Sequence, residues 1–215
     1  MKKMVALLLA VAIVFSLNPA LATTEVKAAQ KREDICLSPA FVKLKGDMEK
    51  AWIDHTIWTR SYIVSAISDR PDQQYVLERL LRNQQDIGNV IKPFYGEAAG
   101  NKLAELLTEH IGIAGHIVAA AKAGNQAEVK KQQTQWHRNA DDIAKFLSDA
   151  NPNWPFKEMQ DMLYTHLQLI TEIVLACLNG DWQRDIEATD QNEIHMLHLA
   201  NILAEGIYKQ FPEKF

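Results

Sequence analysis

Three histidines recur along the chain at a nearly constant step. His55, His110 and His166 lie 55 and 56 residues apart, and the chain holds seven histidines in all. Each is the fourth residue of one of three similar segments, which read "WIDHTIWTRSYIV", "LTEHIGIAGHIV" and "LYTHLQLITEIV". Imidazole binds zinc, iron, copper and manganese, and it exchanges protons near neutral pH. These residues therefore predict a site for a metal ion or a small ligand.

The segments that follow each histidine also resemble one another. They read "NQQDIGNVI", "NADDIAKFL" and "HMLHLANIL", and each contains two polar residues three positions apart: Asn83 and Asp86, Asn139 and Asp142, and His195 and His198. Residues three apart share one face of a helix. The pattern predicts three repeated helical hairpins with a histidine on each first arm. The alternative is weak self-similarity by chance, because helical bundles share an apolar period.

Two of these residues can meet inside a bundle only if both side chains face its interior. The predicted ligands of a mid-bundle metal ion are inward-facing imidazoles and one carboxylate: His110, His166, Asp142 and one of His195 and His198, with His55 as a further candidate. Zinc, iron, copper or manganese would suit such a set. Alternatively, each histidine is a core residue with one satisfied hydrogen bond. The polar layer would then serve only to fix the register of the helices.

No familiar catalytic motif accompanies the histidines. The chain lacks Glu-x-x-His, His-x-x-x-His, His-Glu-x-x-His and Cys-x-x-Cys-His, which removes the common di-iron, hemerythrin, zinc-protease and covalent-haem signatures. A Gly-x-Ser-x-Gly nucleophile elbow is also absent. The sequence therefore identifies no catalytic residue and does not favour an enzyme, so a metalloenzyme ranks below a binding protein.

The elements that must position these residues are helices throughout. Apolar residues recur at three-four spacing, and Pro and Gly separate the periodic segments. We expect helices over residues 45–68, 72–92, 98–123, 126–149, 156–178 and 182–209, with Asn83 as a candidate internal N-cap. Short connections make consecutive helices antiparallel neighbours. The fold class is therefore an all-α up-and-down bundle, in which histidines near the helix midpoints lie at one level.

Two other features concern single side chains. Arg60 falls on an apolar stripe, and a buried guanidinium needs a carboxylate partner, for which Asp142 or Glu109 could serve. Cys36 and Cys177 are the two cysteines of the chain. They could form a disulfide after export, or Cys177 could be a small core residue.

The N-terminal residues have the pattern of an export signal. Lys2 and Lys3 precede an apolar run, and Ala20-Leu21-Ala22 offers a cleavage site. We expect a signal peptide over 1–22, a flexible leader over 23–44, and the bundle over 45–211 in a secreted or cell-envelope protein. The mature chain then has no transmembrane segment. The full chain has a net charge of −4, which becomes −6 without Lys2 and Lys3, and it has no basic block; this argues against nucleic acid as a partner.

Several short segments carry a family resemblance over most of the mature chain. "DHTIWTR", "KPFYG", "TEHIGIA", "NADDIAKFL", "NPNW" and "GIYKQFP" resemble a family of small exported bacterial helical proteins, whose automatic labels include glycosyltransferase and acetylglutamate kinase. The resemblance implies a helical architecture and no established activity, cofactor or site residue. Both labelled activities normally use α/β sheets with phosphate-binding loops, and the chain shows neither.

Two functions follow from these observations. The first is an exported bundle that binds a metal ion or small molecule at a mid-bundle cluster of histidine and aspartate. The second is a non-catalytic envelope or extracellular interaction module, with an envelope protein as its partner, whose buried polar layer is structural.

Overall fold

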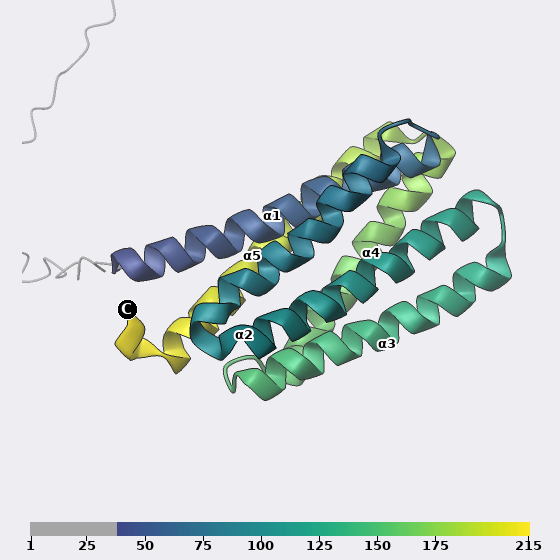
Figure 1. The fold of residues 1–215 in the computed structure, drawn as a ribbon. Coiled ribbons are helices and arrows are strands. Elements are labelled where there is room, and N and C mark those ends of the chain that lie inside the picture. The colour runs from purple at the N-terminus through teal and green to yellow at the C-terminus, as the bar shows by residue number, and fades with distance from the viewer. Residues whose placement is uncertain (1–37) are drawn as a thin grey trace, which may run out of the picture. The chain divides into compact units, whose positions relative to one another are not determined.

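The computed structural model describes residues 38–215, and this part of the chain is helical. It contains α1 (Pro39–Ile67), α2 (Gln73–Lys122), α3 (Gln126–Ala150), α4 (Phe156–Asn179), α5 (Trp182–Gln210) and the short 3-10 helix η1 (Pro212–Lys214) (Figure 1). No strand occurs among these residues. The all-α bundle predicted from the sequence is therefore confirmed.

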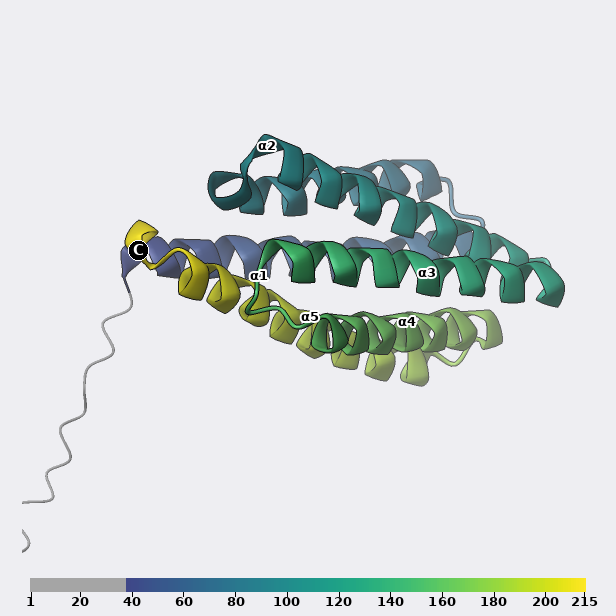
Figure 2. The ribbon, with the colours of Figure 1, turned by 90° about the horizontal axis from the view of Figure 1, so that it is seen from below.

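Helix α2 reverses direction within its own length. Gly96 adopts φ 84° and ψ 169°, a conformation that only glycine accepts without strain, and Pro93 precedes it. Residues 73–95 and 97–122 therefore form two arms that run antiparallel, side by side (Figures 1 and 2). We call them the first and second arms of α2. They correspond to the two helices predicted over 72–92 and 98–123, so the bundle has six antiparallel arms.

The two arms of α2 touch through glycines. A Cβ built on Gly88 would lie 2.4 Å from the carbonyl oxygen of Gly100, so only glycine permits this approach. Gly112 lies on the exposed face of the second arm, and a Cβ added there would meet no atom within 4 Å. The same substitution should therefore have opposite effects at the two positions.

We expect Gly88→Ala to lower the free energy of unfolding by about 1–3 kcal/mol, because the arms must move apart. Gly112→Ala should raise it by about 0.5–1 kcal/mol, because alanine is the better helix former where space is open. Urea unfolding of the two variants beside the parent protein measures both effects. Equal shifts at the two positions would contradict close contact between the arms.

The helix ends follow local capping chemistry. Helix α1 begins at Pro39, because the Ser38 side chain accepts a hydrogen bond from Phe41 N at 3.1 Å and proline suits the first helical turn. The predicted leader over 23–44 was therefore wrong for residues 39–44, which are helical. The predicted signal peptide and Cys36 lie outside the described residues. The α2–α3 turn was predicted correctly: Gly124 has φ 69°, and Asn125 caps α3.

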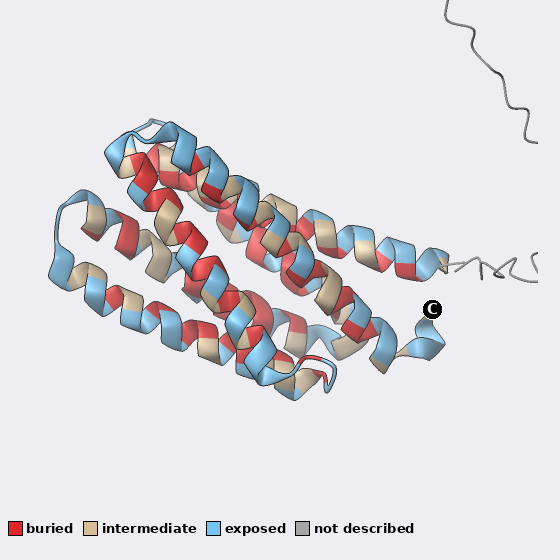
Figure 3. Ribbon diagram, turned by 180° about the vertical axis from the view of Figure 1, so that it is seen from behind, coloured by how far each residue is buried: buried red, intermediate tan, exposed pale blue. Residues whose placement is uncertain are grey.

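The order of the arms gives three of them the same direction. Helix α1, the second arm of α2 and α4 run in one direction, and the first arm of α2, α3 and α5 return in the other (Figures 1 and 2). Their buried residues face one shared core (Figure 3). The first arm of α2 continues through Asn83, so the predicted internal N-cap was wrong. Asn83 is fully buried and bonds to another helix instead.

The turn between α3 and α4 is built around a buried asparagine. The side chain of Asn151 is fully buried, accepts a hydrogen bond from Asn153 N at 2.8 Å and donates one to the Tyr95 hydroxyl at 2.8 Å. Trp154 follows in the core, and its indole N–H donates to the carbonyl of Ile202. These bonds fix the end of the bundle at which α3 and α4 are joined.

One described helix meets the length and hydropathy requirements for crossing a membrane. It is α4, whose mean hydropathy reaches 1.2 over an 18-residue window. The same composition suits a core helix, and much of this helix is buried against the other arms.

Candidate ligand-binding site

The three recurring histidines meet in the middle of the core. The ring of His166 lies 5.5 Å from that of His55 and 6.3 Å from that of His110, measured between centroids. Trp52 packs on the outer side of His55 at 5.5 Å, and Trp136 packs on His110 at 5.1 Å. All five side chains are buried. The prediction that these histidines share one level is confirmed, and we call His55, His110 and His166 the histidine layer.

Two of these rings are each held by a different asparagine on the neighbouring returning arm. Nδ1 of His110 lies 2.7 Å from Oδ1 of Asn139, and Nδ1 of His166 lies 2.7 Å from Oδ1 of Asn192. The amide of Asn139 also donates to the carbonyl of Leu106, four residues before His110, at 3.1 Å. Asn139 therefore ties the histidine and its own helix to α3 through one side chain.

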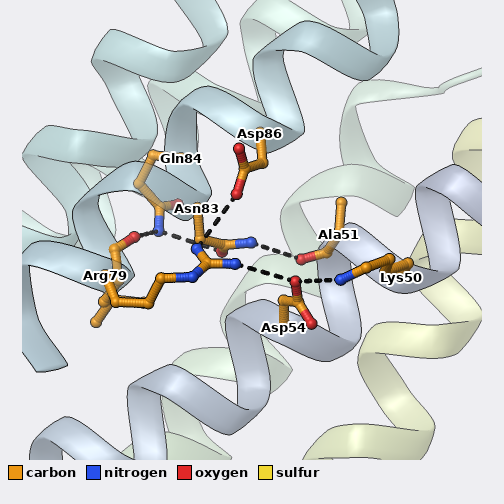
Figure 4. Close-up of polar contacts among 8 residues, drawn as sticks. Lys50, Ala51, Asp54, Arg79, Asn83, Gln84 and Asp86 are labelled. Atoms are coloured by element: carbon orange, nitrogen blue, oxygen red, sulfur yellow. Dashed lines mark hydrogen bonds and ion pairs between the residues drawn. The ribbon is translucent and has the colours of Figure 1, made fainter.

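The same amide-to-carbonyl bond recurs between α1 and the first arm of α2. Asn83 donates to the carbonyl of Ala51, four residues before His55, at 2.9 Å (Figure 4). Here Nδ1 of His55 has no hydrogen-bond partner among the described residues. Asn83 and Gln84 still lie close enough to raise the pKa of the ring against the effect of burial.

The third pair departs from this arrangement. Nε2 of His195 lies 2.7 Å from the carbonyl of Met162, four residues before His166, and so takes the place of the asparagine amide. The side-chain amide nitrogen of Asn192 is consequently left without a partner in the described chain. A side chain on the returning arm thus contacts the carbonyl four residues before the histidine in three successive pairs of arms. In the last pair this side chain is a histidine instead of an asparagine. The duplication of whole hairpins stays a prediction.

Burial keeps the histidine layer uncharged. Desolvation lowers the pKa of His55 to about 4 and that of His110 to about 3. The pKa of His166 is also far below its ordinary value, first through desolvation and then through the neighbouring His55 and His110. The asparagine bonds oppose these changes without reversing them. All three imidazoles are therefore neutral near pH 7.

The hydrogen bonds also define a tautomer. The amide nitrogen of Asn139 donates a hydrogen bond to the Leu106 carbonyl, so the amide oxygen faces His110. That oxygen can only accept a hydrogen bond, so Nδ1 of His110 carries the proton and donates. A neutral ring with a proton on Nδ1 carries its lone pair on Nε2. His110 can therefore accept a hydrogen bond or bind a metal ion through Nε2.

The remaining predicted ligands do not join the histidine layer. Asp142 is exposed and lines a shallow surface hollow with Glu109 and Arg138. His198 is also exposed, and half-buried His195 contacts the Met162 carbonyl. Within residues 38–215, no three His, Cys, Asp or Glu side chains are arranged to hold a metal ion. The predicted set thus divides into three buried imidazoles and three residues outside them.

Arg60 has a different partner from those predicted. Its guanidinium makes a two-pronged contact with Asp185 on α5, and Nε lies 3.0 Å from Oδ1. Asp185 is fully buried, whereas Asp142 and Glu109 lie elsewhere. Cys177 lies next to this pair, and burial, followed by the charge of Asp185, raises the pKa of its thiol to about 11. The thiol is therefore unreactive at neutral pH.

An apolar cavity begins one helical turn beyond the histidine layer. Thr59, Ala114 and Ile170 each lie four residues after one of the histidines and line this cavity, and Trp136 forms part of its wall. Its volume is about 240 Å³. The other lining residues are mostly aliphatic: Tyr62, Ile63, Leu80, Ile111, Ile117, Val118, Ala121, Gln126, Val129, Gln133, Thr171, Val174 and Leu175. No charged side chain is among them.

The cavity reaches the surface between α3 and α4. Gln126 near the start of α3 and Leu175 near the end of α4 are exposed, and both belong to its lining. Gln133 and Thr171 lie partly exposed beside them. We call this opening the mouth. It lies at the opposite end of α3 and α4 from the Asn151 turn.

Unpaired polar atoms gather around the layer and the cavity. In the described residues, seven buried side-chain nitrogen or oxygen atoms have no hydrogen-bond partner. Six belong to residues in or next to the layer, namely Trp52, His55, Thr59, Gln84, Trp136 and Asn192. An unpaired buried polar group costs about 1–3 kcal/mol. Such a concentration points to a region that a bound molecule or water completes.

Sequence reasoning missed Asn192 and Asp185. The constant step between histidines aligned His195 with Asn83 and Asn139. The residue that contacts His166 is instead Asn192, three residues before His195. A signal was present, because Asn-x-x-Asp, Asn-x-x-Asp and Asn-x-x-His recur once the third segment is shifted by three. Nothing in the pattern singled out Asp185, since its contact with Arg60 depends on the relative heights of α1 and α5.

Comparisons with protein-family models, curated proteins and solved structures found no match to the chain. The family resemblance noted from the sequence therefore stays a prediction.

Proposed function

We propose that the protein binds a small, largely apolar molecule in the cavity beside the histidine layer. The observation that supports this most directly is the cavity itself, with a volume of about 240 Å³ and a lining that contains no charged side chain. An engineered apolar cavity of about 150 Å³ in another protein binds benzene. The present cavity is larger and opens at the mouth, so a two-ring molecule is a reasonable probe.

Naphthalene should bind the parent protein at one site with a Kd on the order of 10–100 μM, as expected for about ten carbon atoms. Ala114→Leu would place extra methyl groups in the cavity and should weaken binding at least about tenfold. Isothermal titration measures both. Ala119→Leu is the matched control, because Ala119 lies on the exposed face of the same arm.

Unchanged binding to Ala114→Leu, with the variant folded, would place the naphthalene elsewhere and contradict the proposal. Equal weakening in Ala114→Leu and Ala119→Leu would show that the second arm of α2 tolerates no leucine. The effect on the cavity would then be read from Val174→Phe, which changes a cavity-lining residue on α4.

A metal ion bound by the histidine layer is the second candidate, and the Asn139 bond favours it. Metal-bound histidines commonly donate their other ring N–H to an oxygen, as His110 does here. Binding would require the Nε2 atoms of the three rings to converge to about 2.0–2.1 Å from zinc. Such convergence needs a rearrangement of the rings.

For this candidate we expect near-stoichiometric metal in protein purified without chelator, and its loss in folded His110→Ala and His166→Ala. Elemental analysis provides the measurement, and His198→Ala serves as the exposed-histidine control. No bound metal, together with no rise in Tm on adding zinc, iron, copper or manganese, would reject this candidate and leave the cavity proposal standing.

A further inference from the structure

Thr59 differs from other threonines in these helices. Thr56, Thr108, Thr134 and Thr171 each donate their hydroxyl to the carbonyl oxygen four residues earlier. The hydroxyl of Thr59 makes no hydrogen bond within the described chain, although it is buried and its side chain lines the cavity. Its hydrogen-bonding capacity is therefore unused by the protein.

Trp136 brings a second unused polar atom to the same cavity. Its indole Nε1 is a donor only, it is buried, and it lacks a partner among the described residues. The indole ring packs on His110 and forms part of the cavity wall. Trp136 donates, and Thr59 can donate or accept. Each therefore has hydrogen-bonding capacity that an oxygen atom of a ligand could use.

The surroundings favour an uncharged ligand. No Lys, Arg, Asp or Glu lines the cavity, and the nearby imidazoles are neutral. A carboxylate placed there would lose its hydration without gaining an opposite charge. A hydroxyl or carbonyl group loses less and can pair with Thr59 and Trp136.

We infer that the cavity selects a neutral hydrophobe bearing one hydroxyl or carbonyl oxygen, of which a phenol is the simplest example. This inference rests on the proposed function, because it specifies the chemistry of a ligand in the same cavity. The oxygen bonds to the Thr59 hydroxyl, Trp136 is a second donor in the cavity wall, and the hydrocarbon part fills the aliphatic remainder.

Three probes of equal ring size separate the possibilities: naphthalene, 1-naphthol and 1-naphthoate. The parent protein should bind 1-naphthol about tenfold more tightly than naphthalene, because one additional hydrogen bond is worth about that factor. It should bind 1-naphthoate more weakly than either. Titration calorimetry at a pH where the naphthol is neutral gives all three values of Kd.

Thr59→Val removes the hydroxyl while keeping the shape of the side chain, and it should reduce the preference for naphthol to about twofold or less. Thr56→Val is the matched control, because Thr56 is buried on the same helix, its hydroxyl already bonds to Trp52, and it lies outside the cavity lining. The control should retain the full preference.

The outcomes distinguish this inference from the proposed function. Failure of all three probes to bind overturns both. Equal binding of naphthalene and 1-naphthol overturns the inference and leaves an apolar site. A preference that persists in Thr59→Val, or tight binding of 1-naphthoate, also overturns it.

Discussion

Lowering the pH from about 7.5 to about 5.0 is expected to remove at least about 4 kcal/mol from the free energy of unfolding. His55, His110 and His166 each bind a proton with an ordinary pKa of about 6.5 once the chain unfolds. In the folded protein their pKa values are about 4, about 3 and well below 6.5, with desolvation as the largest cause. His55 and His110 each contribute about 2 kcal/mol to the change, and His166 adds to it in the same direction.

The direction of the effect follows from which state takes up protons. Between pH 6.5 and the folded-state pKa values, the unfolded chain is protonated at these rings and the folded protein is not. Acid therefore favours unfolding. The stabilisation is fully present above about pH 6.5 and declines as the pH falls toward 4. Because a whole domain is stable by only about 5–15 kcal/mol, this loss is a large fraction of the total stability.

Urea unfolding at the two pH values measures this loss, and variants assign it to residues. Folded His110→Phe should lose about 2 kcal/mol less than the parent protein over the same interval, since one buried imidazole is missing. His198→Gln changes an exposed histidine and should leave the interval unchanged. The assignment to the histidine layer fails if His110→Phe shows the parent's full pH dependence.

Arg60→Met should lower the free energy of unfolding by about 3–5 kcal/mol, because Asp185 would be left as a buried, unpaired carboxylate. Both oxygens of Asp185 contact the guanidinium, and the side chain of Asp185 has no exposed surface. The carboxylate also has the Cys177 thiol, a weak donor, and the Thr189 hydroxyl at 3.5 Å, which is a long hydrogen bond. Little else compensates the charge.

A double-mutant cycle tests this explanation. Arg60→Met combined with Asp185→Leu removes both charges and should recover most of the lost stability, to within about 1.5 kcal/mol of the parent protein. Arg70→Met is the control, because Arg70 pairs with Asp72 at the surface, and its effect on stability should be much smaller. If the double variant is as unstable as Arg60→Met alone, packing of the arginine matters more than its charge.

Local sequence features predicted much of the fold. Pro93 and Gly96 marked the reversal inside α2, Gly124 and Asn125 marked the next turn, and apolar spacing located the arms between them. The shared level of the three histidines followed from their positions near the midpoints of arms running in one direction. Each of these predictions depends on a few neighbouring residues or on simple helix geometry.

The members of the site that were missed depend on finer information. Asn139 and Asp142 are three residues apart, yet Asn139 is buried against His110 and Asp142 is exposed. A three-residue step rotates about 60° from a shared face, which is enough to move a side chain from core to surface. The partner of Arg60 depends on how far α5 slides along α1. The cavity depends on small differences between the volumes of many side chains, which no short motif records.

The mouth and the cavity wall affect different properties of binding. The wall contacts the bound molecule, whereas the mouth affects how fast a molecule enters. Helices α3 and α4 are joined and fixed at the Asn151 turn, whereas the mouth lies near the start of α3 and the end of α4. A small rotation of α3 against α4 about that turn displaces their far ends most. The histidine layer lies nearer to that turn than the mouth does, so the same rotation moves the mouth more than the layer. Occupancy at equilibrium then depends on the cavity wall, and the rate of exchange depends on how far these two helix ends separate.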